Sequence, residues 1–359
     1  CNYYNLKELA TIKYGKNQKN VISETGDFPI FGTGGLMGYA TKYLYDKPTV
    51  MIGRKGTINK VRYYDKPFWT VDTLFYTEIN ENIIFPKFFY YLLSRVDFNQ
   101  YNEGTTIPSL RTETLYRLEF EVPSLKVQDK IIKLLGPIEN KIKLNEAINN
   151  NLEQQAMTIY KQCFDSDVNQ EWKKGVLSDV ADITMGQSPI GTSLNTEGNG
   201  TLFFQGRTDF SFRFPNIRLF TTEPKRMASI NDILMSVRAP VGDLNVAHIE
   251  CCIGRGLAAI RSKLNHQSFI FYTLRFLKRK LDSFNGEGTV FGSINKQALN
   301  NFPILIPPAE KIDEFETLVS FMDLTIRNNY NEIHRLNQMR DILLPKLLSG
   351  ELDVSNIDI

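Results

Sequence analysis

Residues 127–159 read VQDKIIKLLGPIENKIKLNEAINNNLEQQAMTI, and this stretch decides the fold. Apolar residues recur along it in steps of three and four, beginning with Val127, Ile131 and Leu134. Such spacing is typical of a helix that packs lengthwise on another helix. Gly136-Pro137 is expected to interrupt the pattern and to leave a short helix followed by a long one.

The pattern returns near the C-terminus, where residues 311–343 read KIDEFETLVSFMDLTIRNNYNEIHRLNQMRDIL. At a constant offset of 184, residues 104–165 align with the second half without a gap. The same offset matches Arg54 with Arg238, whereas Leu6–Ala10 match Leu177–Ala181 at an offset of 171. The chain is therefore a tandem duplication whose second copy carries about thirteen extra residues before position 235.

Within each copy, short strand-like runs punctuated by Gly and Pro precede the helical pattern. We predict two α/β (α+β) modules in pseudo-twofold tandem, separated by two long antiparallel coiled-coil helices. The predicted regions are a first module at 1–122, a helical region at 123–165 with its long helix at about 137–163, a second module at 172–306, and a helical region at 307–350 with its long helix at about 321–348.

Each long helix is expected to measure about 40 Å. An antiparallel pair of this length would place the modules at opposite ends of a rod, close to the 34–36 Å that separates successive turns of DNA. Asn145 and Asn329 occupy equivalent positions on the apolar seam. A polar residue there can set the register of a helix pair, although both side chains could also point into water.

The charge is distributed unevenly along the chain. Of 42 Lys and Arg and 40 Asp and Glu, residues 201–303 hold 14 basic and 7 acidic groups, and residues 304–359 hold 5 and 10. A folded module with a twofold basic excess is typical of nucleic-acid binding, and an acidic C-terminal region is expected to avoid DNA.

Several other functions are disfavoured by the sequence. The 4 Cys and 3 His show no zinc-ligand spacing, so we predict free thiols and no metal site. No Walker motif, Asn-Pro-Pro-Tyr string or nuclease-like carboxylate cluster occurs, and hence no catalytic residue is assigned. The longest apolar stretch, at 83–93, is too short to span a membrane and suits a buried helix at 85–93; we expect a soluble, cytoplasmic protein.

The basic residues of both modules are the candidate DNA contacts. Most are expected to bind phosphate, while Gln205 and Arg207 could read adenine and guanine. For each residue alone, simple solvation at the surface is an equal alternative. The candidates are Arg54, Lys55, Lys60 and Arg62 in the first copy, and Gln205, Arg207, Arg213, Arg218, Lys225, Arg226, Arg238 and Arg255 in the second.

The glycine-rich segment Gly32–Gly38 is interpreted as a loop with unusual backbone angles, or as a place where backbone approaches DNA. Five segments stand out: Phe31–Tyr39, Ile52–Val61, Gly104–Leu110, Val122–Gln128 and Leu343–Gly350. Together they resemble the specificity subunit of type I restriction-modification systems, and the resemblance covers essentially the whole chain. The chain departs from the family pattern at Asn59, where Gly is usual, at Val237–Pro240 and at Pro123-Ser124.

The resemblance implies a non-catalytic subunit of a methyltransferase/endonuclease complex in bacteria or archaea. In such a complex each target recognition domain reads one half of a bipartite double-stranded DNA site, and the paired helices set the unread spacer. The implied partners are two methyltransferase subunits that use S-adenosylmethionine on adenine, and motor-nuclease subunits that use ATP and Mg. This chain itself is expected to bind no cofactor.

Two other classes of function remain open at this stage. An enzyme with an unrecognised site would need a convergent cluster of carboxylates or histidines, which the 3 scattered His disfavour. A purely architectural coiled-coil scaffold would need no charge asymmetry, and the basic excess of residues 201–303 argues against it.

Overall fold

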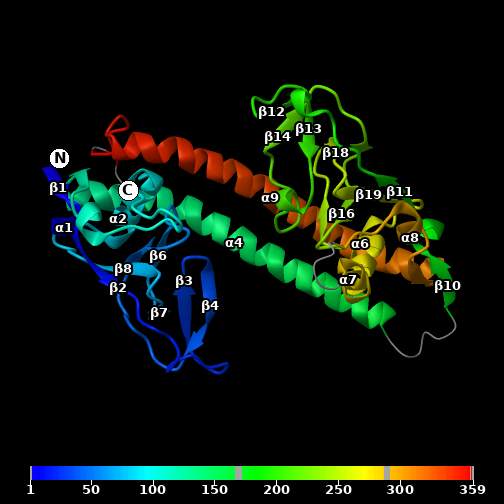
Figure 1. Ribbon diagram of the computed structural model, residues 1–359, viewed down its shortest axis with the longest axis horizontal. Helices are drawn as coiled ribbons and strands as arrows, with labels where there is room; N and C mark the ends of the chain where they lie inside the picture. The colour runs from blue at the N-terminus through cyan, green and yellow to red at the C-terminus, as the bar shows by residue number, and fades with distance from the viewer. Residues whose placement is uncertain (1, 166–171, 287–291, 356, 358–359) are drawn as a thin grey trace. The chain divides into compact units, whose positions relative to one another are not determined.

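A computed structural model describes residues 2–165, 172–286, 292–355 and 357 of the chain (Figure 1). It forms two compact units, one of residues 1–143 with 334–359 and the other of residues 144–333. Each unit contains one strand-rich module and one part of each long helix. The units are described separately below.

The first module is built from three small sheets. An antiparallel ribbon pairs β1 (Asn2–Asn5) with β9 (Glu119–Val122), beside the single turn α1 (Leu6–Leu9). The four-stranded sheet has the order β2 (Ala10–Tyr14), β8 (Leu74–Ile79), β5 (Thr49–Gly53) and β6 (Val61–Tyr64). The three-stranded sheet has the order β4 (Gly35–Ala40), β3 (Phe28–Gly32) and β7 (Trp69–Thr70). The helices are α2 (Pro86–Leu93) and α3 (Thr112–Leu115), with a 3-10 turn at Phe98–Tyr101.

The second module repeats this order. Its ribbon pairs β10 (Lys173–Val176) with β20 (Pro303–Ile306) beside α5 (Leu177–Val180). The four-stranded sheet has the order β11 (Ala181–Met185), β19 (Leu257–Ser262), β16 (Ile233–Ser236) and β17 (Leu244–Val246). The third sheet has five strands, in the order β12 (Leu194–Asn195), β14 (Leu219–Thr221), β13 (Thr201–Phe204), β18 (Cys251–Ile253) and β15 (Met227–Ala228). The helices are α6 (Gln267–Phe276), α7 (Lys278–Asp282) and α8 (Lys296–Asn300), with 3-10 turns at Gly191–Ser193, Arg207–Asp209 and Ser283–Asn285.

The hydrogen bonds of the two modules confirm the tandem duplication. Leu6 N–H donates to the Leu118 carbonyl at 2.8 Å, and Leu177 N–H donates to the Phe302 carbonyl at 2.9 Å. Strand β3 pairs in parallel with β7, and β13 pairs in the same way with β18. The extra residues of the second copy lie mainly between β13 and β14, where residues 205–218 replace the short tip of residues 33–34 between β3 and β4.

The expected match of Arg54 with Arg238 is wrong by one residue. Arg54 N–H donates to the Thr73 carbonyl at 2.9 Å, and the corresponding bond in the second module runs from Val237 N–H to the Gly256 carbonyl at 2.9 Å. The structural equivalent of Arg238 is therefore Lys55. The sequence offset missed this because the second copy carries one residue more between this turn and Ser293.

The two long helices are α4 (Leu125–Phe164) and α9 (Ala309–Leu348), so both begin about twelve residues before the expected starts. The expected interruption at Gly136-Pro137 does not occur, because α4 continues through Pro137. Proline removes one backbone hydrogen bond, but the turns on either side bury Ile131, Leu135 and Ile142. This burial outweighs the lost bond, since tertiary packing stabilises most helices in proteins.

The helices pair antiparallel within the second unit. The rings of Phe164 and Phe315 lie 5.2 Å apart, while Asn145 near the other end contacts Glu332. In the first unit Ile131 of α4 shares an apolar core with Leu347 of α9 and with the tail residue Val354. The protein thus has two α+β modules, each followed by a long helix that packs on its counterpart.

Across the described ranges, every helix is too short or too polar to span a bilayer. Cys163, Cys251 and Cys252 are free thiols, as predicted, while Cys1 lies outside the described residues. Burial raises the pKa of Cys251 to about 12. The predicted buried helix at 85–93 is confirmed as α2.

Candidate nucleic-acid interface

The first module brings two of the sequence motifs together at one turn. Lys55, which follows β5, forms an isolated β-bridge with Ser109. Gly56 N–H donates to the Pro108 carbonyl at 2.8 Å. A side chain at Gly53 would lie 2.1 Å from the Thr57 carbonyl oxygen, so glycine is required there. The turn at residues 53–60 therefore rests on the segment at residues 104–109.

Lys55 and Lys60 are exposed on this turn, and neither ammonium group has a polar partner among the described residues. The Arg54 guanidinium already has intramolecular partners, because it donates to the Asp72 carbonyl at 2.9 Å and lies 5.0 Å from the Tyr14 ring centroid. Lys55 and Lys60 are therefore the stronger phosphate-contact candidates in this module.

Arg62 is engaged within its own module. Its guanidinium donates to the Gly32 carbonyl at 3.1 Å and to the Thr33 carbonyl at 2.7 Å. Desolvation by burial lowers the pKa of Arg62, as expected for a half-buried cation without a carboxylate partner. Arg62 supports the tip of the β3–β4 hairpin, whose Gly35 has a φ of 135°. The unusual backbone angles predicted for Gly32–Gly38 are confirmed at Gly35 and Gly38, but the predicted loop is only the tip at residues 33–34, because the other residues pair in β3 and β4.

Three of the candidate arginines in the second module are exposed and have no side-chain partner among the described residues: Arg226, Arg238 and Arg255. Arg238 follows β16 and forms an isolated β-bridge with Ser293, as Lys55 does with Ser109. The Arg226 carbonyl accepts the N–H of Ile253 at 2.8 Å, which places Arg226 beside the turn that carries Arg255.

The inserted segment at residues 205–218 is ordered around one buried carboxylate, Asp209. This carboxylate accepts the N–H of Gln205 at 2.7 Å and pairs with the Arg218 guanidinium. Arg207 pairs with Asp243 at 2.8 Å and stays 59% exposed, and Lys225 lies 4.0 Å from Glu223. The Gln205 side chain is exposed at the start of the segment.

Arg213 was expected at the DNA surface, and this expectation is wrong. Its side chain is 4% exposed and lies 3.3 Å from Glu153 and 3.2 Å from Asp323, the two carboxylates coming from α4 and α9. Burial acts to lower the pKa of Arg213, but Asp323, Tyr272 and Glu153 together raise it. Arg213 is an internal cation that attaches the inserted segment to the helices.

The two seam asparagines lie at the helix contact rather than in open solvent. Asn145 is 1% exposed and its amide donates to Glu332 at 2.7 Å. The Asn329 amide donates to Asn149 at 2.8 Å. Both bonds cross from one helix to the other, which is the geometry that a role in setting register requires.

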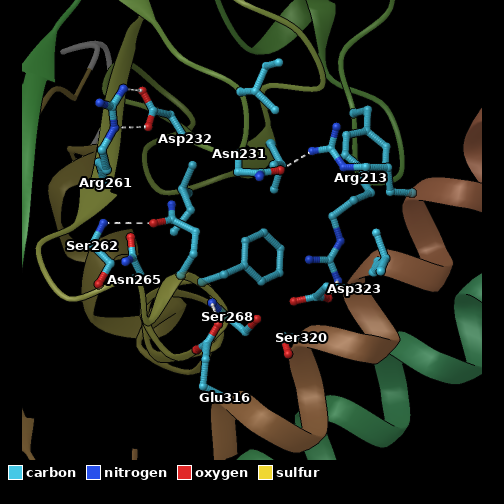
Figure 2. A pocket seen from close by; sticks show the side chains of 18 residues that line it. Arg213, Asn231, Asp232, Arg261, Ser262, Asn265, Ser268, Glu316, Ser320 and Asp323 are labelled. Carbon is cyan, nitrogen blue, oxygen red and sulfur yellow. Dashed lines mark hydrogen bonds and ion pairs between the residues drawn. The ribbon is translucent and has the colours of Figure 1, made fainter. Parts of the chain in front are cut away.

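A groove of about 560 Å³ is lined by residues of α9 and of the second module (Figure 2). Asp232 pairs with Arg261 on one side, and Arg213 points to Asp323 on the other. Glu316 accepts the N–H groups that begin α6, and burial raises its pKa. The charged side chains of the groove are thus all engaged. Among the described residues, no cluster of His, Cys, Asp or Glu could hold a metal ion.

Each of the two α+β modules exposes a cation at the equivalent turn and is followed by a long helix. The chain belongs to the family described as "Type I restriction modification DNA specificity domain", whose model matches residues 1–154 and 169–338. It is a DNA-recognition subunit of a type I restriction-modification system.

Individual relatives agree with this family. A Methanocaldococcus jannaschii protein assigned as the type I restriction enzyme MjaX specificity subunit is 32% identical, over 77% of this chain and 70% of that one. The MjaIX specificity subunit of the same organism is 24% identical over 88% and 80%. A crystal structure of the S subunit from M. genitalium shares the fold, with a TM-score of 0.64, 18% identity and coverage of 97% and 96%.

Proposed function

We propose that each module reads one half of a bipartite, asymmetric DNA site and that the paired helices set the unread spacer. The observation that carries this proposal is the equivalence of Lys55 and Arg238. Each is exposed directly after the same sheet strand, and each is bridged to the serine of the same downstream motif. Two cations placed alike in two modules suit two contacts with DNA phosphates.

The modules differ where they would read bases. The first has a two-residue hairpin tip at Thr33-Gly34, whereas the second has the inserted segment that carries Gln205, Arg207 and Arg218. Different side chains at equivalent places suit different half-sites, because base edges are read by individual side chains. An asymmetric site is the expected result.

Catalysis is assigned to partner subunits. In this proposal the chain itself is non-catalytic and binds no cofactor, while methyltransferase subunits bring S-adenosylmethionine to adenine, and motor-nuclease subunits use ATP and Mg. The similar proteins are named as specificity subunits of type I restriction enzymes, and these names support the specificity role alone.

The methyltransferase subunits are proposed to dock on α9. Leu318, Phe321 and Leu324 are 58%, 72% and 52% exposed at intervals of three along this helix. Three large apolar side chains exposed together on one helix are typical of a surface that a partner covers. A methyltransferase subunit docked on this surface would lie beside the second module, which reads one half of the site in this proposal.

The test is to map adenine methylation in plasmid DNA from cells that express this chain with its methyltransferase subunit. Cells that express the methyltransferase alone are the control. A split, gapped motif that appears only with this chain is expected, and it would give both half-sites at once. No new methylation, when the subunits are shown to associate, would contradict the proposal and favour the scaffold alternative.

A further inference from the structure

Each module is attached to the helix that follows it by a buried or half-buried ion pair, and the two pairs use the same helix position. Lys87 pairs with Glu139 of α4 at 2.6 Å. Arg213 pairs with Asp323 of α9 at 3.2 Å. Glu139 and Asp323 are 184 residues apart, which is the repeat offset. We call Lys87–Glu139 and Arg213–Asp323 the helix-anchoring ion pairs.

In the first unit the anchor is enclosed by tyrosines. The Lys87 ammonium lies 4.8 Å from the Tyr63 ring centroid, 4.9 Å from Tyr90 and 5.3 Å from Tyr91. The side chains of Lys87 and Glu139 are only 19% and 11% exposed. Burial, followed by the charge of Glu139, raises the pKa of Tyr91. One ammonium group therefore joins β6, α2 and α4.

In the second unit the anchor is more deeply buried. The Arg213 guanidinium donates to the Tyr272 hydroxyl at 2.9 Å and stacks on the Phe271 ring at 4.0 Å. It also contacts Glu153, so it joins the inserted segment and α6 to both long helices. Figure 2 shows Arg213 and Asp323 side by side at the edge of the groove.

The second anchor is reinforced by the neighbouring residue. The Phe214 ring lies 4.7 Å from Tyr330 of α9 and 5.0 Å below the Arg327 guanidinium. Arg327 also donates to the His248 carbonyl at 3.0 Å. The module is therefore held at several points along α9, which leaves little freedom for it to tilt.

The anchoring cations come from different elements, since Lys87 lies on α2 and Arg213 lies in the inserted segment. Their convergence on one helix position is therefore not a simple consequence of the duplication. Buried ion pairs add little net stability compared with apolar packing, but they can favour a single geometry. A cation that must meet a carboxylate and aromatic faces at once permits few orientations.

We propose that Lys87, Glu139, Arg213 and Asp323 are positioning residues that set the orientation of each module on its helix and thereby the strictness of the DNA spacer. The inference rests on the proposed function, because spacer strictness has meaning only if both modules engage one DNA. A module that tilts would tolerate half-sites one base pair closer or farther apart.

The test compares duplexes that carry the mapped site with the native spacer, with one base pair added and with one removed. The protein is the full chain in complex with its methyltransferase subunits, and the variant is Lys87→Met with Glu139→Gln. This pair of changes removes both charges and keeps most of the packing volume. We expect the ratio of the affinity for the native-spacer duplex to that for either altered duplex to fall about tenfold. A change of this size is typical of the coupling energy between residues of one ion-pair network. Lys87→Arg should retain the ratio.

The matched control is Lys13→Met with Glu78→Gln, which removes an exposed ion pair of the same module at 3.1 Å. Its ratio should equal that of the unaltered protein. An equal loss of affinity for all three duplexes in the anchor variant would indicate only a folding defect and would overturn the inference. Arg213→Met with Asp323→Asn repeats the test in the second module. No spacer preference in the unaltered protein would instead contradict the proposed function.

Discussion

At the scale of single residues, Lys55 and Arg238 provide the test of the phosphate surface. Removing either by Lys55→Ala or Arg238→Ala should weaken DNA binding and reduce the slope of log affinity against log salt by about 0.9, because one phosphate contact is lost. Affinity measured over a series of salt concentrations checks this. Lys311→Ala, which removes an exposed cation of α9, should leave the slope unchanged. An unaltered slope in both variants would exclude them from the surface.

Arg54→Ala is also predicted to lower the affinity and the salt slope. Its effect should be smaller than that of Lys55→Ala, because Arg54 already donates to the Asp72 carbonyl and stacks on Tyr14. Denaturant unfolding of this variant measures the stability lost with the Asp72 and Tyr14 contacts, and so separates that loss from the loss of a DNA contact. A salt slope that falls as much in Arg54→Ala as in Lys55→Ala would show that the guanidinium leaves Asp72 to bind DNA.

The sequence could identify candidate cations but not their surroundings. Arg213 and Arg226 lie in the same basic segment, yet Arg213 is 4% exposed and Arg226 is exposed. What separates them is a tertiary contact with Glu153 and Asp323, more than fifty residues away in either direction. The Lys87 anchor was missed for the same reason, although a lysine inside the apolar run at residues 85–93 was a usable signal, since a buried charge needs a partner.

At the scale of elements, the exposed face of α9 gives a separable prediction. Phe321→Ser should reduce co-purification of the methyltransferase subunit, because Phe321 is 72% exposed and its loss removes apolar area from the proposed contact. Leu264→Ser, at a side chain that is 71% exposed outside α9, is the control. DNA affinity of the chain should be the same in both variants. Full association of Phe321→Ser with the methyltransferase would place the docking surface elsewhere.

The periodicity of apolar residues predicts the boundaries of the helices only in part. The heptad-like spacing identified both long helices, but it could not show that α4 continues through Pro137. Proline propensity is local, whereas the burial of Ile131 and Leu135 beside Pro137 depends on α9 and the first module. The strands of the modules were foreseen as short buried runs, and Thr49–Gly53 is fully buried. Their assembly into separate sheets depends on long-range pairing that no local pattern contains.

At the scale of the whole molecule, the duplication can be predicted from the sequence, because a repeat of 184 residues leaves matching hydrophobic patterns in both halves.

The length of the paired helices gives a prediction for the DNA spacer. Inserting four residues after Lys143 in α4 and four after Ile333 in α9 adds about 6 Å and about 1.1 turns to each helix, so the seam still faces its partner. The spacer of the methylated motif should grow by about two base pairs, at about 3.4 Å each.

Insertion in α4 alone separates length from register. The Asn145–Glu332 and Asn149–Asn329 hydrogen bonds of the second unit and the Ile131–Leu347 packing of the first unit then cannot all keep their register, because only one helix lengthens. The single insertion should therefore lower the melting temperature and yield little or no methylation, whereas the double insertion should methylate a longer motif. Methylation mapping of the three proteins decides the matter: a spacer that stays constant in an active double-insertion protein would show that the helices hold the modules but do not measure the DNA.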